Sequence, residues 1–219
     1  MALALLPIVF VLTVMSSTLL LRQRGQRLKP PWLTFVLVAV TFVVGTFAVF
    51  DQAVSDVLRR DFEKLVAGEW WRLISPLVGQ DGGLVGLIFN VVVLLFAGAA
   101  VENLFGPWML AGVYLAAGVL SEVAAYTVMP GQGYAGNSVG CMGLAGLLLV
   151  SAVVADPPAR LIGILGLAAG ILLLVFWDLH GIGFAVGALA GLGYWLKTRP
   201  RRSATRVAPG SPAESSAGS

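Results

Sequence analysis

The feature that most restricts the fold of this chain is a series of long apolar stretches that contain almost no charged side chain. A stretch of about 18 or more such residues is long enough to cross a lipid bilayer as a helix. Only 11% of the residues are charged, whereas a soluble domain carries about 25%, so few side chains remain to cover a water-facing surface. The sequence therefore predicts an all-α polytopic membrane protein.

Seven apolar segments are expected to span the membrane, with ends uncertain by about two to four residues. They cover Ala2–Leu21, Trp32–Phe50, Leu84–Val101, Trp108–Met129, Ser138–Ala155, Leu161–Trp177 and Leu179–Leu196. No basic residue precedes the first segment, and a basic cluster follows it, which favours a retained membrane anchor over a cleaved signal peptide.

Lysine and arginine placement predicts how the chain is oriented. One basic cluster follows the first segment (Arg22, Arg24, Arg27, Lys29) and a second follows the last (Lys197, Arg199, Arg201, Arg202). Six spans separate the two clusters, so both lie on one side, and the positive-inside rule makes that side the cytoplasm. We expect a multi-pass protein of the plasma membrane whose polar loop 51–83 lies outside the cell.

Several classes of site are excluded by composition. Cys141 is the only cysteine and His180 the only histidine, so clustered Cys/His metal ligation is not expected, and nothing indicates another cofactor. The net charge of +3 comes from basic residues that flank apolar segments rather than from a basic, aromatic-rich face. The lipid bilayer, not nucleic acid, is therefore the expected partner.

Four polar residues inside the apolar segments fall near the same membrane surface. At 1.5 Å per residue, Asn90, Glu122, Ser138 and His180 all lie within about 10 Å of the outer edge. Simple structural roles exist for three of them: Ser138 as a helix cap, Asn90 as a helix–helix hydrogen bond, and Glu122 as a surface or interhelical contact. An ionisable histidine at this depth is a functional candidate, although Asp178 could cap the same helix.

Glycine spacing predicts that the helices carrying Ser138 and His180 touch. Each helix has small residues on one face: His180, Gly183, Gly187 and Gly191 in one, and Gly136, Gly140, Gly143 and Gly146 in the other. Such ladders let two backbones approach closely. We expect Ser138 Oγ to lie within hydrogen-bond reach of a His180 ring nitrogen, as a nucleophile lies beside its base. The Asn90 amide could then stabilise an oxyanion.

Four motifs in order make the chain similar to the rhomboid intramembrane serine proteases. They are Gly68–Pro76, the pair Glu102 and Gly106, the stretch Gly136–Ser138, and the series His180, Gly183 and Gly187. The resemblance covers about Gly68 to Trp195. It implies a rhomboid-like six-helix core over 32–198 with the external loop 51–83. Residues 1–31 would add an N-terminal transmembrane anchor with a basic cytoplasmic linker, and 199–219 a disordered cytoplasmic tail.

The resemblance also implies a function: cleavage of single-span membrane proteins in or next to the bilayer. Ser138 would be the nucleophile and His180 the base of a Ser-His dyad, with Asn90 in the oxyanion site. The chain departs from the family pattern in four places: Val139 replaces a glycine, Gly86 a histidine and Met142 an aromatic residue, and the first loop lacks the histidine usual near Gln80. A catalytically weak or inactive rhomboid-like protein that binds client helices is therefore the alternative, and a small transporter ranks last. The sequence leaves the oligomeric state open.

Overall fold

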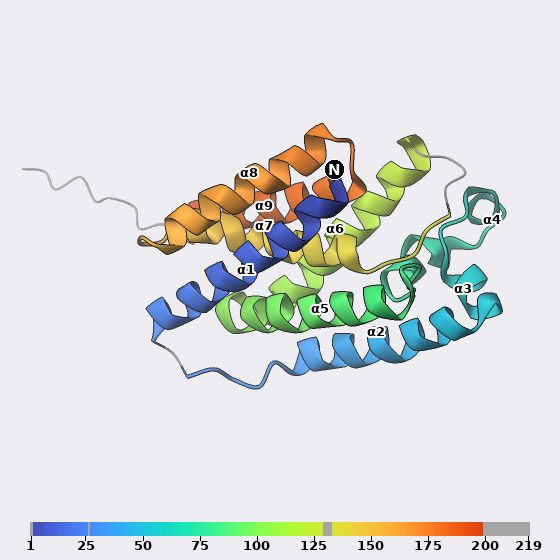
Figure 1. The fold of residues 1–219 in the computed structure, drawn as a ribbon, viewed down its shortest axis with the longest axis horizontal. Coiled ribbons are helices and arrows are strands. Elements are labelled where there is room, and N and C mark those ends of the chain that lie inside the picture. The colour runs from blue at the N-terminus through green and yellow to red at the C-terminus, as the bar shows by residue number, and fades with distance from the viewer. Residues whose placement is uncertain (1, 26, 129–132, 199–219) are drawn as a thin grey trace, which may run out of the picture.

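A computed structural model describes residues 2–25, 27–128 and 133–198 as a bundle of α-helices (Figure 1). The expected tail 199–219 lies outside the described residues. The seven long helices are α1 Ala2–Arg24, α2 Trp32–Phe50, α5 Gly83–Phe105, α6 Pro107–Val128, α7 Ser138–Val153, α8 Ala159–Val175 and α9 Leu179–Thr198. Each overlaps one predicted segment, and the all-α polytopic architecture is confirmed.

Two of these helices are shorter than a typical membrane span. Five helices are long and apolar enough to cross a bilayer, whereas α7 has 16 residues and α8 has 17. At 1.5 Å per residue, α7 is about 24 Å long, less than the ~30 Å hydrocarbon core. Protein rather than lipid surrounds α7, because residues Ser138 to Leu149 are all buried. Its length therefore need not match the bilayer thickness.

The centre of the bundle is α7, which packs against α1, α5, α6, α8 and α9. Figure 1 shows α2 lying along α5 on the outside of the bundle, while α1 runs across the neighbouring face. The α7 side chains Cys141, Leu144 and Leu148 have no exposed surface. Neighbouring helices on every side hold α7 in place, so the side chain of its first residue has a well-defined position.

The predicted contact between the two glycine-bearing helices is confirmed. A Cβ atom at Gly187 of α9 would overlap the carbonyl oxygen of Gly143 in α7, and one at Gly183 would overlap that of Val139. In the other direction, a Cβ at Gly146 of α7 would overlap the backbone of Phe184. Because glycine has no side chain, these positions allow the backbones of α7 and α9 to approach each other closely.

Residues 51–83 fold into a compact layer rather than an open loop. They form α3 Gln52–Leu58, α4 Phe62–Val66 and the 3₁₀ turns η1 Trp70–Leu73 and η2 Ser75–Leu77. Arg72 is 2% exposed and binds Glu69 through Nε at 2.7 Å and the carbonyl oxygens of Asp56 and Arg59 through Nη1. A buried guanidinium with these partners holds α3 and the start of η1 together.

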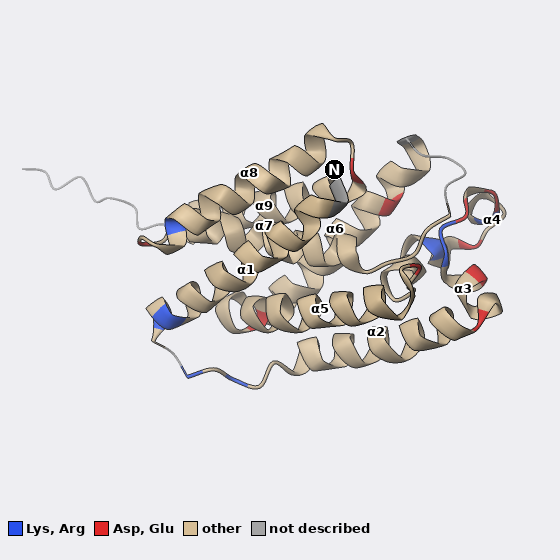
Figure 2. Cartoon of the chain, in the orientation of Figure 1, with Lys and Arg blue, Asp and Glu red and all other residues tan. Residues whose placement is uncertain are grey.

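Charged residues gather at the two ends of the bundle (Figure 2). Lysines and arginines lie where α1 ends and along the linker that follows it, while residues of both signs surround α3 and α4 at the opposite end. We call these the basic end and the loop end. The helices between them carry few charges, as expected for a membrane-embedded surface.

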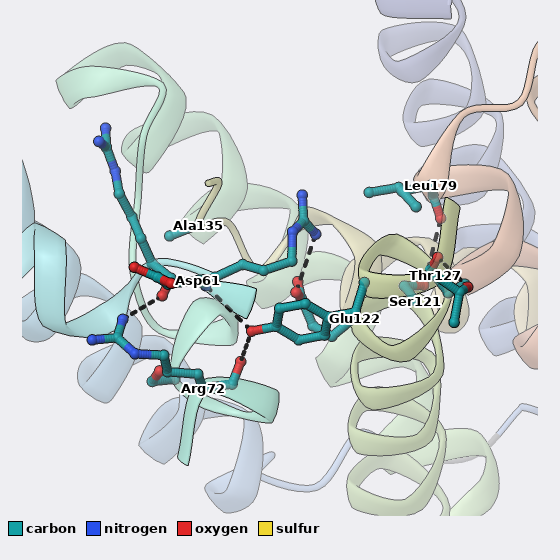
Figure 3. A network of polar contacts seen from close by, with 12 residues as sticks. Asp61, Arg72, Ser121, Glu122, Thr127, Ala135 and Leu179 are labelled. Atoms are coloured by element: carbon teal, nitrogen blue, oxygen red, sulfur yellow. Dashed lines mark hydrogen bonds and ion pairs between the residues drawn. The ribbon is translucent and has the colours of Figure 1, made fainter. Parts of the chain in front are cut away.

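Glu122 corrects one sequence-based expectation. It neither reaches the surface nor binds another long helix, because it is 4% exposed and accepts a hydrogen bond from Arg60 Nη1 of the loop layer at 3.1 Å. Figure 3 shows Glu122 on α6 pointing into the polar network beneath the loop layer. Tyr126, one turn later, donates to the carbonyl oxygen of Arg72 at 3.3 Å. Side chains of α6 therefore fasten the loop layer to the bundle.

Replacing Arg60 by alanine is expected to destabilise the protein by about 3–5 kcal/mol, because the Glu122 carboxylate would stay buried without its partner. The double substitution Arg60→Met with Glu122→Leu should recover most of that loss. Thermal unfolding in detergent micelles measures both. Lys64→Ala is the matched control, since its pair with Asp61 is exposed and should be worth at most about 1 kcal/mol. Equal losses of stability in Arg60→Ala and Lys64→Ala would contradict the expectation.

Candidate active site

Ser138 is the first residue of α7, at the loop end of the bundle. The segment before it is fixed to the loop layer: Gly136 N–H donates to the Pro76 carbonyl at 2.8 Å, and Gly136 forms a β-bridge with Gln80. The N-cap residue of α7 is Asn137, not Ser138. The simple reading of Ser138 as a helix cap is therefore wrong, and its hydroxyl is available for another partner.

That partner is His180, the second residue of α9. Ser138 Oγ lies 2.8 Å from His180 Nε2, so the predicted hydrogen-bond distance is confirmed. Both side chains are only partly shielded, with 8% of Ser138 and 16% of the His180 side chain exposed. The close α7–α9 contact places the hydroxyl and the imidazole together, as the glycine spacing predicts.

Asp178 fixes the orientation of the imidazole. Its Oδ1 lies 2.5 Å from His180 Nδ1 and accepts the His180 backbone N–H at 2.9 Å. Burial alone would raise the pKa of Asp178, but the hydrogen bonds and charge of His180 outweigh burial and lower it below its ordinary value. The carboxylate is therefore ionised at neutral pH. Capping of α9 explains its contact with the His180 backbone N–H but not its contact with the imidazole ring.

The Asp178 contact selects one tautomer of His180. An ionised carboxylate accepts hydrogen bonds only, so Nδ1 must carry the proton. In the neutral form of the ring, Nε2 then has a free lone pair and accepts the Ser138 hydroxyl hydrogen, which is the arrangement needed for a general base. Ser138, His180 and Asp178 thus form a linear series of hydroxyl, imidazole and carboxylate.

A cavity of about 330 Å³ opens beside these residues. Its wall includes Ser138, His180, Asn90 and Gln80, together with Tyr134 of the segment before α7. Asn90 lies on α5, is 6% exposed, and donates from Nδ2 to Gln80 Oε1 at 2.9 Å. The three residues predicted from the sequence therefore share one cavity, and Val139 is not among the residues that line it.

The first helix also contributes to this cavity. Leu6, Pro7 and Phe10 of α1 line it, and the Phe10 ring contacts the Phe89 ring of α5 edge-on with centroids 5.5 Å apart. The sequence predicts α1 only as an anchor outside the six-helix core. Its contact with the site was not predicted, because the apolar pattern of a membrane helix does not reveal which neighbours it packs against.

Two polar residues of the site were missed by sequence reasoning. Asp178 was assigned only a capping role, although its position two residues before His180 allows both contacts. Gln80 lies ten residues before Asn90, in the connection between η2 and α5, and its proximity depends on how the loop layer folds. Among the described residues, no cluster of three or more His, Cys, Asp or Glu side chains could hold a metal ion.

Comparison with known proteins finds relatives of this chain. Residues 67–200 match the family model described as the rhomboid domain. The chain is 33% identical over 132 residues to rhomboid protease GluP of Bacillus subtilis (strain 168), covering 59% of this chain and 24% of that protein. It is 31% identical over 83 residues to YdcA of the same organism, named a putative rhomboid protease, covering 37% of this chain and 41% of YdcA. The chain thus spans less than half the length of either curated relative.

Proposed function

Because the chain belongs to the rhomboid family, we propose that it is an intramembrane serine endopeptidase that uses Ser138 and His180. The observation that carries this proposal is the 2.8 Å contact between Ser138 Oγ and His180 Nε2 beside an open cavity. An alcohol next to a correctly oriented imidazole is the arrangement of an activated serine nucleophile. Val139, which departs from the family pattern, is buried outside the cavity and leaves it clear.

The proposed reaction proceeds through an acyl-enzyme. Ser138 Oγ attacks the scissile carbonyl carbon while its proton passes to His180 Nε2. Asn90 Nδ2 and the backbone N–H groups at the start of α7 face the developing oxyanion. His180 then gives its proton to the leaving amine, the C–N bond breaks, and water activated by the same imidazole hydrolyses the ester.

The position of the site supports a proposal for the class of substrate. Ser138 and His180 lie at the loop end, at the first turns of their helices, whereas the basic residues at and after the end of α1 lie at the other end. We assign the basic end to the cytoplasm and the loop end to the extracytoplasmic face of the plasma membrane. Single-span membrane proteins cleaved near the outer end of their helix are the proposed substrates, and residues 32–198 the proposed catalytic core.

Reconstitution in liposomes tests the proposal. The purified chain should cleave a single-span protein with a helix-destabilising sequence near its outer end, and a fluorophosphonate probe should label Ser138. Folded protein that neither labels nor cleaves would contradict the enzyme and support a rhomboid-like protein that binds client helices without cutting them.

Asp178→Ala is expected to lower kcat by about 10²–10⁴ with KM within about threefold, because the imidazole loses its orienting carboxylate but substrate contacts remain. Cleavage rates at several substrate densities in liposomes separate the two constants. Asp156→Ala is the control, since Asp156 lies just before α8 at the basic end and should leave both unchanged. A large rise in KM with unchanged kcat would assign Asp178 to substrate binding instead.

A further inference from the structure

Gln80 is the buried polar residue of the cavity to which the mechanism above gives no role. It is 5% exposed, and its backbone is fixed beside the nucleophile by the β-bridge to Gly136. Asp81, the next residue, strengthens this junction: its N–H donates to the Ala135 carbonyl at 3.0 Å, and its carboxylate accepts the Ala135 N–H at 2.8 Å. The loop layer thus holds Gln80 against the segment that leads into Ser138.

The carboxamide of Gln80 has one occupied end and one free end. Oε1 accepts the hydrogen bond from Asn90 Nδ2 at 2.9 Å. Among the described residues, Nε2 has no hydrogen-bond partner, although it carries two N–H donors. Gln80 lies in the wall of the cavity that also contains Ser138. Buried amide N–H groups normally donate hydrogen bonds, so Nε2 is available to donate to an acceptor that enters the cavity.

Space for this amide comes from two glycines. A Cβ atom at Gly86 would lie 2.6 Å from Gln80 Nε2, and one at Gly82 would lie 2.8 Å from it. Gly86 is one turn before Asn90 on the same face of α5. Gln80 therefore fills the volume that a side chain at position 86 would need.

We propose that Gln80 Nε2 is a second side-chain donor to the oxyanion formed when Ser138 attacks the substrate, acting beside Asn90. This inference rests on the proposed protease function. Oε1 holds one N–H of Asn90, which orients that amide, while Nε2 presents its own N–H groups to the cavity. Preorganised donors of this kind stabilise developing negative charge more than they stabilise the neutral substrate.

Kinetics of Gln80 variants in liposomes test the proposal. Gln80→Ala should lower kcat by about 10²–10³ with KM within about twofold, the loss expected for one oxyanion donor. Gln80→Glu keeps the side-chain shape but replaces the donor by a carboxylate, and it should lower kcat by at least as much as Gln80→Ala. Gly86→Ala keeps Gln80 but displaces its amide, and should also lower kcat. Gln52→Ala is the control, because Gln52 is an exposed glutamine of α3.

A double substitution separates donation from support of Asn90. In an Asn90→Ala background, Gln80→Ala should still lower kcat by about tenfold or more if Nε2 donates to the oxyanion itself. No further loss in that background would overturn the proposal and make Gln80 a positioning residue. If wild type cleaves and Ser138→Ala does not, while Gln80→Ala retains full kcat, only this inference fails. Absence of Ser138-dependent cleavage in the wild type would overturn the protease function as well.

A different observation, the uneven attachment of α1, carries a second inference. At the basic end, Arg24 Nη1 donates to the Leu104 carbonyl at 2.5 Å, and Gln23 Nε2 to that of Asp156 at 3.4 Å. Nearer the cavity, the hydroxyls of Thr13 and Ser17 bind carbonyls of α1 itself. Apolar packing therefore holds the loop-end part of α1 to the neighbouring helices, and lipid tails can replace such packing at low cost.

From this asymmetry we infer that α1 is a gate through which a substrate helix reaches Ser138, an inference that also rests on the proposed protease function. Its Leu6, Pro7 and Phe10 cover the cavity, and its polar contacts at the basic end act as the pivot. Displacement of the loop-end part would open a path from the bilayer to the active site. A small fluorophosphonate probe that enters from the aqueous side would reach Ser138 without displacement of α1.

Cross-linking distinguishes a gate from a fixed part of the site. Phe10→Cys with Phe89→Cys, joined by a short bis-methanethiosulfonate, should cut single-span substrate cleavage by about tenfold or more. Fluorophosphonate labelling should stay within about twofold, and reductant should restore cleavage. Cys141 is fully buried and does not compete for the reagent. A pair at the basic end that does not involve α1, Phe105→Cys with Tyr194→Cys, is the control and should leave cleavage unchanged. Full cleavage by the protein cross-linked between positions 10 and 89, or loss of labelling along with cleavage, would overturn the gate.

Discussion

Ser138→Ala is expected to abolish fluorophosphonate labelling and to lower substrate cleavage by about six orders of magnitude, the effect of removing the nucleophile from a serine hydrolase. The substitution removes one oxygen atom from a side chain that is 8% exposed, so the fold should not change. Loss of activity would then report on chemistry alone. Gel-based detection of the probe and of the cleaved substrate in liposomes measures both effects.

The controls for this prediction are on the same two helices. Ser151→Ala removes a hydroxyl from α7 that binds only the Leu147 carbonyl, and it should leave labelling and cleavage unchanged. His180→Ala should reduce labelling sharply while Ser138 is still present, because the hydroxyl loses its base. Residual labelling in Ser138→Ala equal to that of wild type would place the nucleophile elsewhere and contradict the proposed function.

The helical architecture was predictable because bilayer thickness and backbone hydrogen bonding leave few alternatives for long apolar segments. The Ser138–His180 contact was predictable for a related reason. A helix with glycines at positions 183, 187 and 191 has a face that only another backbone can fill, and the helix after Gly136 offers the matching surface. Regular periodicity fixes which face of each helix meets the other.

The remaining site residues could not be predicted because irregular backbone positions them. Gln80 reaches the cavity through a single β-bridge, and Arg60 reaches Glu122 from the turn between α3 and α4. Neither turn has a periodic pattern from which its path follows. The contact of α1 with the cavity was missed for a different reason, since residues 2–12 of α1 are all apolar and their sequence does not mark the buried face.

The glycine contact that brings the dyad together leads to a second large effect. Gly187→Ala is expected to destabilise the protein by about 1–3 kcal/mol or more and to abolish Ser138 labelling. A Cβ atom at this position overlaps the Gly143 carbonyl oxygen, and backbone on both sides leaves no flexible side chain to give way. The helices α7 and α9 must separate, and the 2.8 Å contact at their loop-end tips must lengthen with them.

A matched control for this prediction lies further along the same helix. A Cβ atom at Gly193 of α9 would meet no atom within 4 Å, so Gly193→Ala changes the same residue type without a clash. Alanine is the better helix former by about 0.8–1.0 kcal/mol, so this variant should be as stable as wild type or slightly more so, with full labelling. Thermal unfolding in micelles and probe labelling test both substitutions in parallel. If Gly187→Ala kept full labelling, close approach of α7 and α9 would not be what joins Ser138 to His180, and the physical basis of the dyad would have to lie in the segments that precede the two helices.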